Sequence, residues 1–271
     1  MISRVFRPKV ITLPNGKAVT QPRSMMPLIL LGVLVVTYFS VQLTGFSMTV
    51  LVTRINHFFF ILGEMIPPRL AYMNRVWQPL LDTIKMSLLG STIGALLAVP
   101  AAILASSNIV KSKVVVFLTR LLLSGVRTLP TLIVALIATF VLGLGTLAGT
   151  VAIAVFTFAY IGKQLYELIE TVDMGAYEAM EAIGIRRIPA FWLAIAPQIM
   201  PVYIATGLFC LEGNVRHAAI LGWVGAGGIG LILNERIQFR DYSAVGMILL
   251  ALFVTVVFIE ILSHFIRRRL T

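Results

Sequence analysis

Long runs of apolar residues, separated by short polar segments, make up most of the chain. A helix needs about 20 apolar residues to cross the hydrocarbon layer of a membrane. Runs of about this length occupy residues 27–46, 81–106, 114–142, 144–165, 197–224 and 243–266. They predict about six transmembrane helices. The third run is longer than a span requires and is interrupted by Arg127-Thr128-Leu129-Pro130, where proline breaks helical hydrogen bonding.

The segments outside these runs complete the predicted organisation. Residues 49–79 carry His57, Glu64, Pro67 and Pro68 between apolar stretches, which indicates an outer connection containing an interfacial helix. No convincing small-residue cleavage site follows the first run, so that run is expected to remain as an anchor. We expect an N-terminal arm over 1–24, the first transmembrane helix and outer connection over 25–76, and a five-helix core over 77–271.

Composition supports membrane as the solvent. Hydrophobic residues make up 59% of the chain and charged residues only 12%. A soluble domain has about a quarter of its residues charged. The predicted fold class is therefore an all-α integral membrane protein, and a soluble globular protein is excluded.

The net charge of +11 predicts orientation, because cytoplasmic loops are enriched in lysine and arginine. With both termini cytoplasmic, the inner segments hold Arg4, Arg7, Lys9, Lys17, Arg23, Lys111, Lys113, Lys163, Arg186, Arg187, Arg267, Arg268 and Arg269. The outer segments hold only Arg54, Arg69, Arg75, Lys85, Arg236 and Arg240. Arg120, Arg127 and Arg216 fall near membrane depth. Short basic clusters between apolar runs are typical of loops facing anionic lipid, which argues against nucleic acid as a partner.

A polar stretch over about 167–189 separates the fourth and fifth spans. Glu178, Ala179 and Ala182 favour a short helix, and Gly184 is suited to end it. The helix, small on one face and charged on the other, could dock on a partner or could simply join two spans. Spacing alone favours the simple connection.

One motif in this stretch resembles a known family. The inner-membrane permeases of binding-protein-dependent ABC importers carry Glu-Ala-Ala, three residues, Gly, nine residues and Ile-x-Leu-Pro. Glu178, Ala179, Gly184 and Pro197 match, while Met180 replaces the second alanine. Ala194 and Ala196 stand where isoleucine and leucine are usual, which weakens the apolar end of the motif.

The region from about Trp77 to the C-terminus resembles the phosphonate-type permeases of that family. The closest agreement covers Asn214-Val215-Arg216 and the run Leu221-Gly222-Trp223-Val224-Gly225-Ala226-Gly227-Gly228-Ile229-Gly230. The segments 176–184 and 197–201 agree as well.

The resemblance implies a type I importer permease core, MetI-like in fold, in a bacterial cytoplasmic membrane. It implies an identical or paralogous second permease and two cytoplasmic ATPase subunits, which hold the ATP and magnesium while this chain holds no cofactor. A periplasmic or lipid-anchored binding protein would deliver phosphonate, phosphite or a hypophosphite-like oxyanion. The surface helix over about 175–188 would couple to the ATPase, through Ala176, Tyr177, Glu178, Ala179, Glu181, Ala182, Gly184 and Arg186.

A second glycine motif satisfies the G-x-G-x-x-G pattern of dinucleotide-binding loops. That pattern requires a preceding strand, whereas this one follows a predicted membrane span. We expect an outer turn with close backbone packing that acts as a flexible gate. The gate residues would be Gly225, Gly227, Gly228 and Gly230.

Polar residues at membrane depth are the remaining candidates, because they are costly there without a partner or cavity. Glu212 and Arg216 are four residues apart, so they either neutralise each other or serve function. Asn214 lies on another face and is expected to be free to bond a solute or the second subunit. Arg127 offers forked donors for an oxyanion, but it could instead snorkel or pair with an acid.

Two other function classes have weaker support in the sequence. A transporter driven by an ion gradient would need buried carboxylates, and only Glu212 is a strong candidate. A membrane enzyme would need a paired acid and base or a metal cluster. The lone Cys210 and the scattered histidines, among them His57 and His264, favour neither.

Overall fold

The computed structural model describes residues 10–12, 16–20 and 25–269. Of the residues predicted on the inner side, Arg4, Arg7, Lys9 and Arg23 lie outside these ranges. Contacts divide the chain into two compact units, Met1–Phe60 and Ile61–Thr271. Each unit is considered by itself.

The first unit contains a small ribbon and the first long helix. Strands β1 (Val10–Thr12) and β2 (Ala18–Thr20) pair antiparallel, with Ile11 opposite Val19. Helix α1 (Met26–Leu43) confirms the first predicted span, and its large apolar side chains are exposed, as expected for contact with lipid. Helix α2 (Met48–Glu64) begins in this unit and is the helix predicted within the connection.

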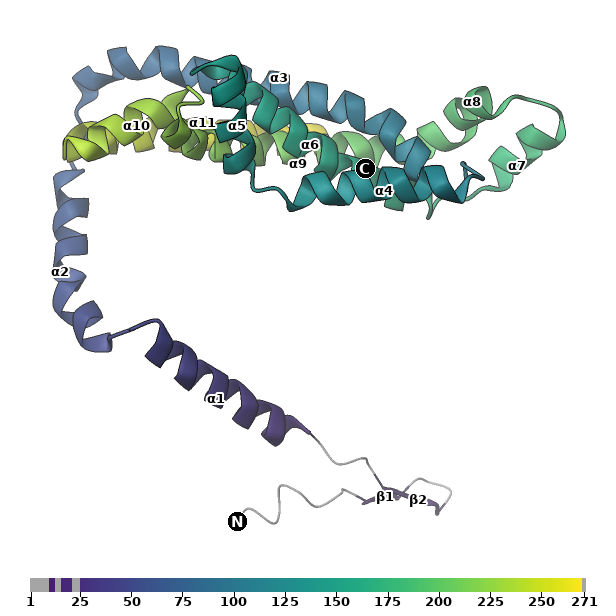
Figure 1. Cartoon of the computed structure of the whole chain (residues 1–271), viewed down its shortest axis with the longest axis horizontal. Coiled ribbons are helices and arrows are strands. Elements are labelled where there is room, and N and C mark those ends of the chain that lie inside the picture. Colours follow the sequence, from purple (N-terminus) through teal and green to yellow (C-terminus); the bar gives the residue numbers. More distant parts are fainter. Residues whose placement is uncertain (1–9, 13–15, 21–24, 270–271) are drawn as a thin grey trace. The chain divides into compact units, whose positions relative to one another are not determined.

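The second unit is a helical bundle, shown in Figure 1, in which α3 and α9 both pack on α6, and α11 packs on α3 and α9. Its elements are η2 (Leu70–Tyr72), α3 (Met73–Ala105), α4 (Lys113–Thr128), α5 (Thr131–Leu142), α6 (Thr146–Ile169), α7 (Gly175–Ala182), α8 (Arg187–Ala190), the π-helical η3 (Phe191–Ile195), α9 (Ala196–Leu221), η4 (Gly222–Val224), α10 (Ile229–Gln238) and α11 (Tyr242–Arg267). Five helical stretches in the described chain are long and apolar enough to span a membrane, or six with the bent α4–α5 pair. The predicted count is therefore confirmed.

Small residues allow α3 and α6 to pack closely. A Cβ atom added at Gly90 would lie 2.7 Å from the carbonyl oxygen of Thr150, and one at Gly94 would lie 2.5 Å from that of Ala154. Such approach of backbones is the usual basis of helix association in lipid, where burial of apolar surface provides no driving force. Any larger residue at either position would separate the two helices.

The start of α3 differs from the prediction. The helix begins at Met73 rather than near residue 81, so the last part of the predicted outer connection is helical. Tyr72, Val76 and Leu80 are buried in a cluster with residues of α11 and α10, which extends the helix beyond its apolar run.

The interruption predicted at Arg127–Pro130 is confirmed. Helix α4 ends at Thr128, Pro130 caps α5, and the two helices meet at 90°. Leu129 has an extended backbone, as a residue preceding proline prefers. The sequence predicted the break but not the size of the bend.

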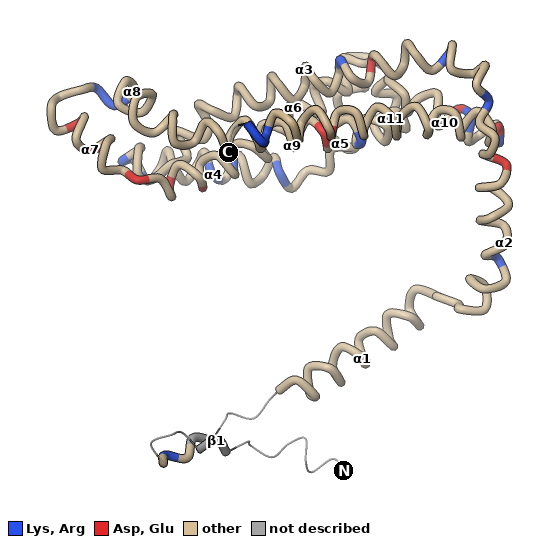
Figure 2. The backbone as a smooth tube through the Cα atoms, turned by 180° about the vertical axis from the view of Figure 1, so that it is seen from behind, with Lys and Arg blue, Asp and Glu red and all other residues tan. Residues whose placement is uncertain are grey.

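Charged residues concentrate at the two ends of the second unit. Figure 2 shows them around α7 and α8 at one end and around α10 at the other, with a further blue group beside the C-terminus and scattered charges on the otherwise tan helices between. At the α10 end, the Arg69 guanidinium makes two 2.9 Å hydrogen bonds to the Asp241 carboxylate. These charged ends and the apolar middle fit a bundle that crosses a membrane.

Candidate functional site

Helix α7 protrudes from the end of the bundle and is anchored by one aromatic side chain. Tyr177 is 3% exposed and packs in the apolar cluster that also contains Ile169, Ala190 and Phe191. Burial, followed by the nearby Glu181 carboxylate, raises the pKa of the Tyr177 hydroxyl above its ordinary value. The anchor therefore stays neutral and fixes which face of α7 points away from the bundle.

The outward face of α7 consists of small and acidic residues. Ala176, Glu178, Ala179 and Ala182 are exposed, and the side chain of Ile183 after the helix is 77% exposed. Glu181 is half-buried and pairs with Arg187 of α8 at 3.0 Å, while Arg186 is exposed. Small residues and Glu178 therefore lie together on the part of α7 that points away from the bundle.

Gly184 ends α7 as the sequence predicted. Its φ is +85°, a conformation that residues with a Cβ rarely adopt. The N–H of Gly184 donates to the carbonyl of Glu181 at 3.0 Å, and the N–H of Ile185 donates to that of Met180 at 3.0 Å. These bonds satisfy carbonyls that the helix end leaves open. The chain then turns directly into α8.

The glycine motif forms a closely packed turn between α9 and α10. Gly225, Gly227 and Gly228 all have positive φ, between +70° and +77°. A Cβ added at Gly227 would lie 2.8 Å from the backbone nitrogen of Thr146, and one at Gly228 would lie 2.6 Å from Thr83 Oγ1. Gly230 lies against the carbonyl of Ala219. The predicted close packing is confirmed, and the turn follows a helix rather than the strand that a dinucleotide site requires.

Asn214 is not free, contrary to the prediction. Its side chain is 1% exposed, and its Nδ2 donates to Ser91 Oγ at 2.8 Å and to Thr157 Oγ1 at 2.9 Å. Cys210 lies beside it with Sγ 3.7 Å from Thr157 Oγ1. The amide joins α3, α6 and α9 inside one chain, because burial at membrane depth requires its donors to find partners.

Glu212 and Arg216 form the ion pair that their spacing allowed. The Glu212 side chain is 6% exposed and the Arg216 side chain 52% exposed. Arg267 of α11 also approaches Glu212, with an N–O distance of 3.7 Å. The buried Glu212 carboxylate thus binds one side of the Arg216 guanidinium. The rest of that group is exposed on the surface of α9.

Arg127 lies at the bend between α4 and α5 and is exposed. None of the ion pairs among the described residues includes it. Among the described residues, Arg127 therefore has no acidic partner in an ion pair. The structure also does not show Arg127 beside Arg216. Within the described chain, no group of three histidine, cysteine or acidic residues could hold a metal.

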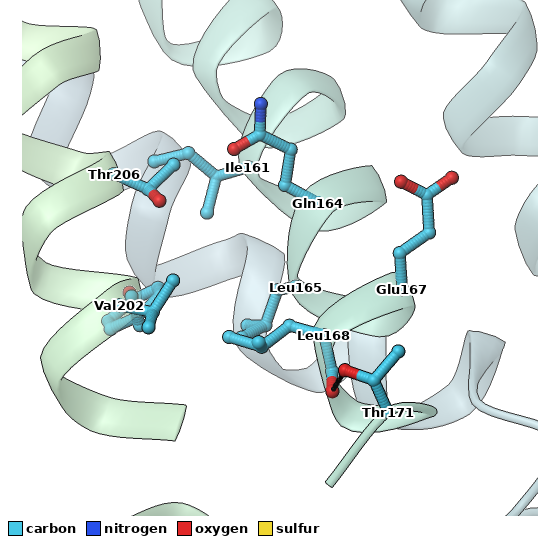
Figure 3. Close-up of a pocket in the computed structure, with 9 residues that line it drawn as sticks. Ile161, Gln164, Leu165, Glu167, Leu168, Thr171, Val202 and Thr206 are labelled. Atoms are coloured by element: carbon cyan, nitrogen blue, oxygen red, sulfur yellow. Dashed lines mark hydrogen bonds between the residues drawn. The ribbon is translucent and has the colours of Figure 1, made fainter. Parts of the chain in front are cut away.

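A groove between α6 and α9 adds residues that sequence reasoning missed. It encloses about 350 Å³ and is lined by Gln164, Glu167 and Thr171 of the α6 side and by Val202 and Thr206 of α9. Figure 3 shows Val202 and Thr206 facing Ile161, Leu165 and Leu168 across it. The signal was present in the sequence, because Gln164, Glu167 and Thr171 recur at helical spacing where the fourth apolar run meets the polar stretch that follows it.

Nearer the glycine turn, the same side of the bundle carries His217 and Arg216. His217 of α9 contacts Phe156 of α6 edge to face, with ring centroids 6.0 Å apart. Tyr160 stacks on Phe156 one turn along α6. Polar and amphipathic side chains on this surface are unsuited to lipid, so it is a candidate for a water-filled path or a subunit contact.

Comparisons with known proteins agree with this architecture. Residues 90–271 match the family described as the binding-protein-dependent transport system inner membrane component. The phosphite transport system permease protein PtxC of Stutzerimonas stutzeri is 31% identical over 206 residues, covering 76% of this chain and 75% of that protein. The phosphate-import permease protein PhnE of Mycolicibacterium smegmatis is 34% identical over 211 residues, but the match spans only 40% of that relative's length.

A solved structure shares the fold. The methionine ABC transporter MetNI, in inward-facing conformations, contains a chain that superposes with a TM-score of 0.66 at 19% identity, covering 75% of this chain and 99% of that one. The matched family, over residues 90–271, includes α7, the glycine turn and the α6–α9 groove. The chain therefore belongs to the inner-membrane permease components of binding-protein-dependent ABC importers, of the phosphonate type.

Proposed function

We propose that this permease is the membrane channel of an ATP-driven importer, and that α7 docks on a separate cytoplasmic ATPase. The outward face of α7 carries the proposal. It combines alanines that permit close approach, an exposed Ile183 and the acidic Glu178, on a helix fixed by a buried tyrosine. An exposed apolar side chain beside small residues is suited to insertion into a groove on a partner.

The proposed cargo is a phosphonate, phosphite or hypophosphite-like oxyanion. The names of two relatives support this class, since one is a phosphite permease and the other a phosphate-import permease. Arg127 and Arg216 are the exposed guanidinium groups that could contact such an anion. Arginine suits this role because its planar fork of donors matches oxyanion geometry.

The α6–α9 groove is proposed to face the path between two permease subunits. Its polar residues would be costly against lipid, whereas a water-filled path or a partner subunit would satisfy them. Two copies, or one copy and a paralogue, would enclose the path, and a periplasmic or lipid-anchored binding protein would load it. ATP and magnesium would bind the ATPase subunits, and their closure would alternate access to the path.

The proposed orientation places α7 and both termini in the cytoplasm of a bacterial cell, following the lysine and arginine distribution. The native Cys210 is buried, so a new cysteine can be labelled selectively. Ala182→Cys should react with a membrane-impermeant maleimide only in inside-out vesicles. Labelling in right-side-out vesicles would reverse the assigned orientation.

Reconstitution tests the central proposal. The permease should retain the ATPase, and in proteoliposomes with the binding protein it should import phosphite or a phosphonate only when ATP is supplied. Ala179→Arg, which fills the small face of α7, should abolish ATPase retention, and Glu178→Ala should uncouple transport. Uptake that continues without any ATPase, and that stops when the proton gradient is collapsed, would instead support a gradient-driven transporter.

A further inference from the structure

The chain reaches α7 through a short arm, residues 170–174, that is held from two sides. Asn108 Nδ2, in the turn between α3 and α4, donates to the carbonyl of Ile169 at 2.8 Å, just before the arm, and lies 3.3 Å from Met174 Sδ within it. On the other side, Gln198 Nε2 of α9 donates to the carbonyl of Asp173 at 3.1 Å. The arm is therefore bonded to two separate parts of the bundle before α7 begins.

Glu170 is the strongest attachment of this arm. Its Oε1 accepts a 2.7 Å hydrogen bond from the backbone N–H of Ser107, and further bonds from the Ser107 hydroxyl and the Arg120 guanidinium. Ser107 lies between α3 and α4, and Arg120 lies within α4. One carboxylate oxygen thus joins the end of α6 to two other segments.

Arg120 is itself fixed in place. Its Nε donates to the carbonyl of Ala105 at 2.8 Å, and its guanidinium carbon lies 4.8 Å from the centroid of the Tyr166 ring. Ala105 is the last residue of α3, where carbonyls have no partner within the helix. The same guanidinium therefore caps α3, packs on α6 and binds Glu170, which lysine could not do with a single ammonium group.

The Glu170–Arg120 pair differs from an ordinary surface ion pair. The two side chains are 25% and 34% exposed, so water screens them less than it screens exposed groups. Burial raises the pKa of Glu170, but the bonds from Ser107 and the charge of Arg120 outweigh it, and the pKa falls below its ordinary 4.5. The carboxylate is charged at neutral pH.

On its far side, α7 is followed by the turn at residues 183–186, and a single helical stretch begins after that turn. After the Gly184 turn, α8, η3 and α9 follow one another without a loop, and the Arg187–Glu181 pair braces the turn. The arm at residues 170–174 is thus the non-helical connection between α7 and α6, and movement of α7 relative to α6 could be absorbed there. Its attachment decides whether α3, α4 and α6 move with α7.

We propose that Glu170 is a positioning residue for coupling, which fixes the arm to Ser107 and Arg120 so that displacement of α7 is passed to α3, α4 and α6. This inference rests on the proposed docking of α7 on an ATPase. Glu170 touches neither nucleotide nor cargo in this role. It acts through the position of α7.

The reconstituted importer tests the inference through its coupling ratio, the number of oxyanions imported per ATP hydrolysed. We expect Glu170→Gln to lower this ratio about tenfold, as loss of one charge-assisted hydrogen bond allows, with the amount of bound ATPase unchanged. Glu235→Gln is the matched control, because Glu235 also binds an arginine but lies on α10 at the opposite end. An unchanged ratio in Glu170→Gln would overturn the inference.

Hydrogen exchange provides a readout that does not depend on the ATPase. Amides of residues 171–182 should exchange faster in Glu170→Gln than in the native permease, while those of α10 stay unchanged. The double variant Arg120→Gln with Glu170→Gln should lose less than the sum of the two single variants, because the two side chains bind each other. If Glu170→Gln does not accumulate, Ser107→Ala should show the same changes at smaller size.

The outcomes separate this inference from the proposed function. Failure of the native permease to retain any ATPase would refute docking of α7, while faster exchange at 171–182 would still show that Glu170 fixes the arm. Native exchange rates in both Glu170→Gln and Ser107→Ala would refute the role of Glu170, whatever binds α7.

Discussion

The hydroxyl of Thr83 accepts a hydrogen bond from the backbone N–H of Ile229 at 2.7 Å and donates one to the carbonyl of Pro79 at 2.8 Å. Thr83 is fully buried in α3, and Ile229 is the first residue of α10. The pair therefore attaches the glycine turn to α3 at the point where Gly228 leaves no room for a Cβ atom. The turn is bonded to its neighbours, so movement there would first have to break this contact.

Replacing Thr83 by valine should destabilise the permease. Valine has the same shape but no acceptor, so the buried N–H of Ile229 would lose its partner at a cost of about 1–3 kcal/mol. Thermal unfolding of the detergent-solubilised protein should show a lower midpoint. Thr83→Ser keeps the hydroxyl and is the control, and equal midpoints for the two variants would show that the hydrogen bond contributes nothing.

Gly184→Ala should uncouple ATP hydrolysis from transport without preventing membrane insertion. The φ of +85° is strained for alanine, so α7 should end differently and present its small face at another angle. The measurement is the coupling ratio in proteoliposomes. Gly125→Ala is the control, since Gly125 is helical in α4 and has no atom near an added Cβ. Similar ratios for both variants would contradict the assignment.

Variants of the Glu212–Arg216 pair can separate a structural role of Arg216 from a role of Arg216 in transport. Arg216→Gln leaves the buried Glu212 carboxylate with the more distant Arg267, at 3.7 Å, and should lower the yield of folded protein, because a buried charge that loses its nearest partner is costly. Adding Glu212→Gln should restore the yield. If uptake returns with the yield, Arg216 is structural, whereas folded protein without uptake would place Arg216 in the substrate path.

Arg127→Ala should reduce uptake more than assembly. The side chain is exposed at the bend of α4 and α5 and binds no acid among the described residues, so its removal leaves no unpaired carboxylate behind. Oxyanion uptake should fall at least about tenfold, as for loss of a bidentate charged contact, with ATPase retention unchanged. Arg127→Lys should recover part of the uptake, and native uptake in Arg127→Ala would exclude a substrate role.

The Glu170 attachment should resist mild acid. Because its pKa in the folded protein is lowered from 4.5, its contribution to stability is complete above that pH and is lost only as the pH falls through the lower folded value. Protection of residues 171–182 from hydrogen exchange, corrected for the intrinsic effect of pH, should therefore stay constant from neutral pH down to 4.5. A loss of protection above pH 4.5 would contradict the lowered pKa.

Sequence patterns predicted the spans, the break between α4 and α5 and the end of α7, because each depends on residues that are close together in the chain. Apolar length predicts a membrane helix, Pro130 predicts the break between α4 and α5, and Gly184 predicts the end of α7. The early start of α3 was missed, because it depends on Tyr72 and Val76 packing against distant helices. A hydropathy run contains no information on that packing.

The candidate site was predictable only in part, for a related reason. Four-residue spacing correctly allowed the Glu212–Arg216 pair, which lies within one helix. Asn214 bonds Ser91 of α3 and Thr157 of α6, and Glu170 bonds Ser107 in the α3–α4 turn and Arg120 of α4, all more than 45 residues away in the chain. Spacing could therefore show that these polar side chains need partners, but not which residues supply them.

Helix α9 and the turns that continue it form a stretch from Arg187 to Val224, 38 residues with α7 attached at one end and the glycine turn at the other. At the helical rise of about 1.5 Å per residue, this stretch is about 57 Å long. A tilt of only a few degrees at one end of a rod of that length displaces the other end by several ångströms. A small displacement at the α7 end could thus be geometrically amplified at the glycine turn, without any remodelling of the helices between.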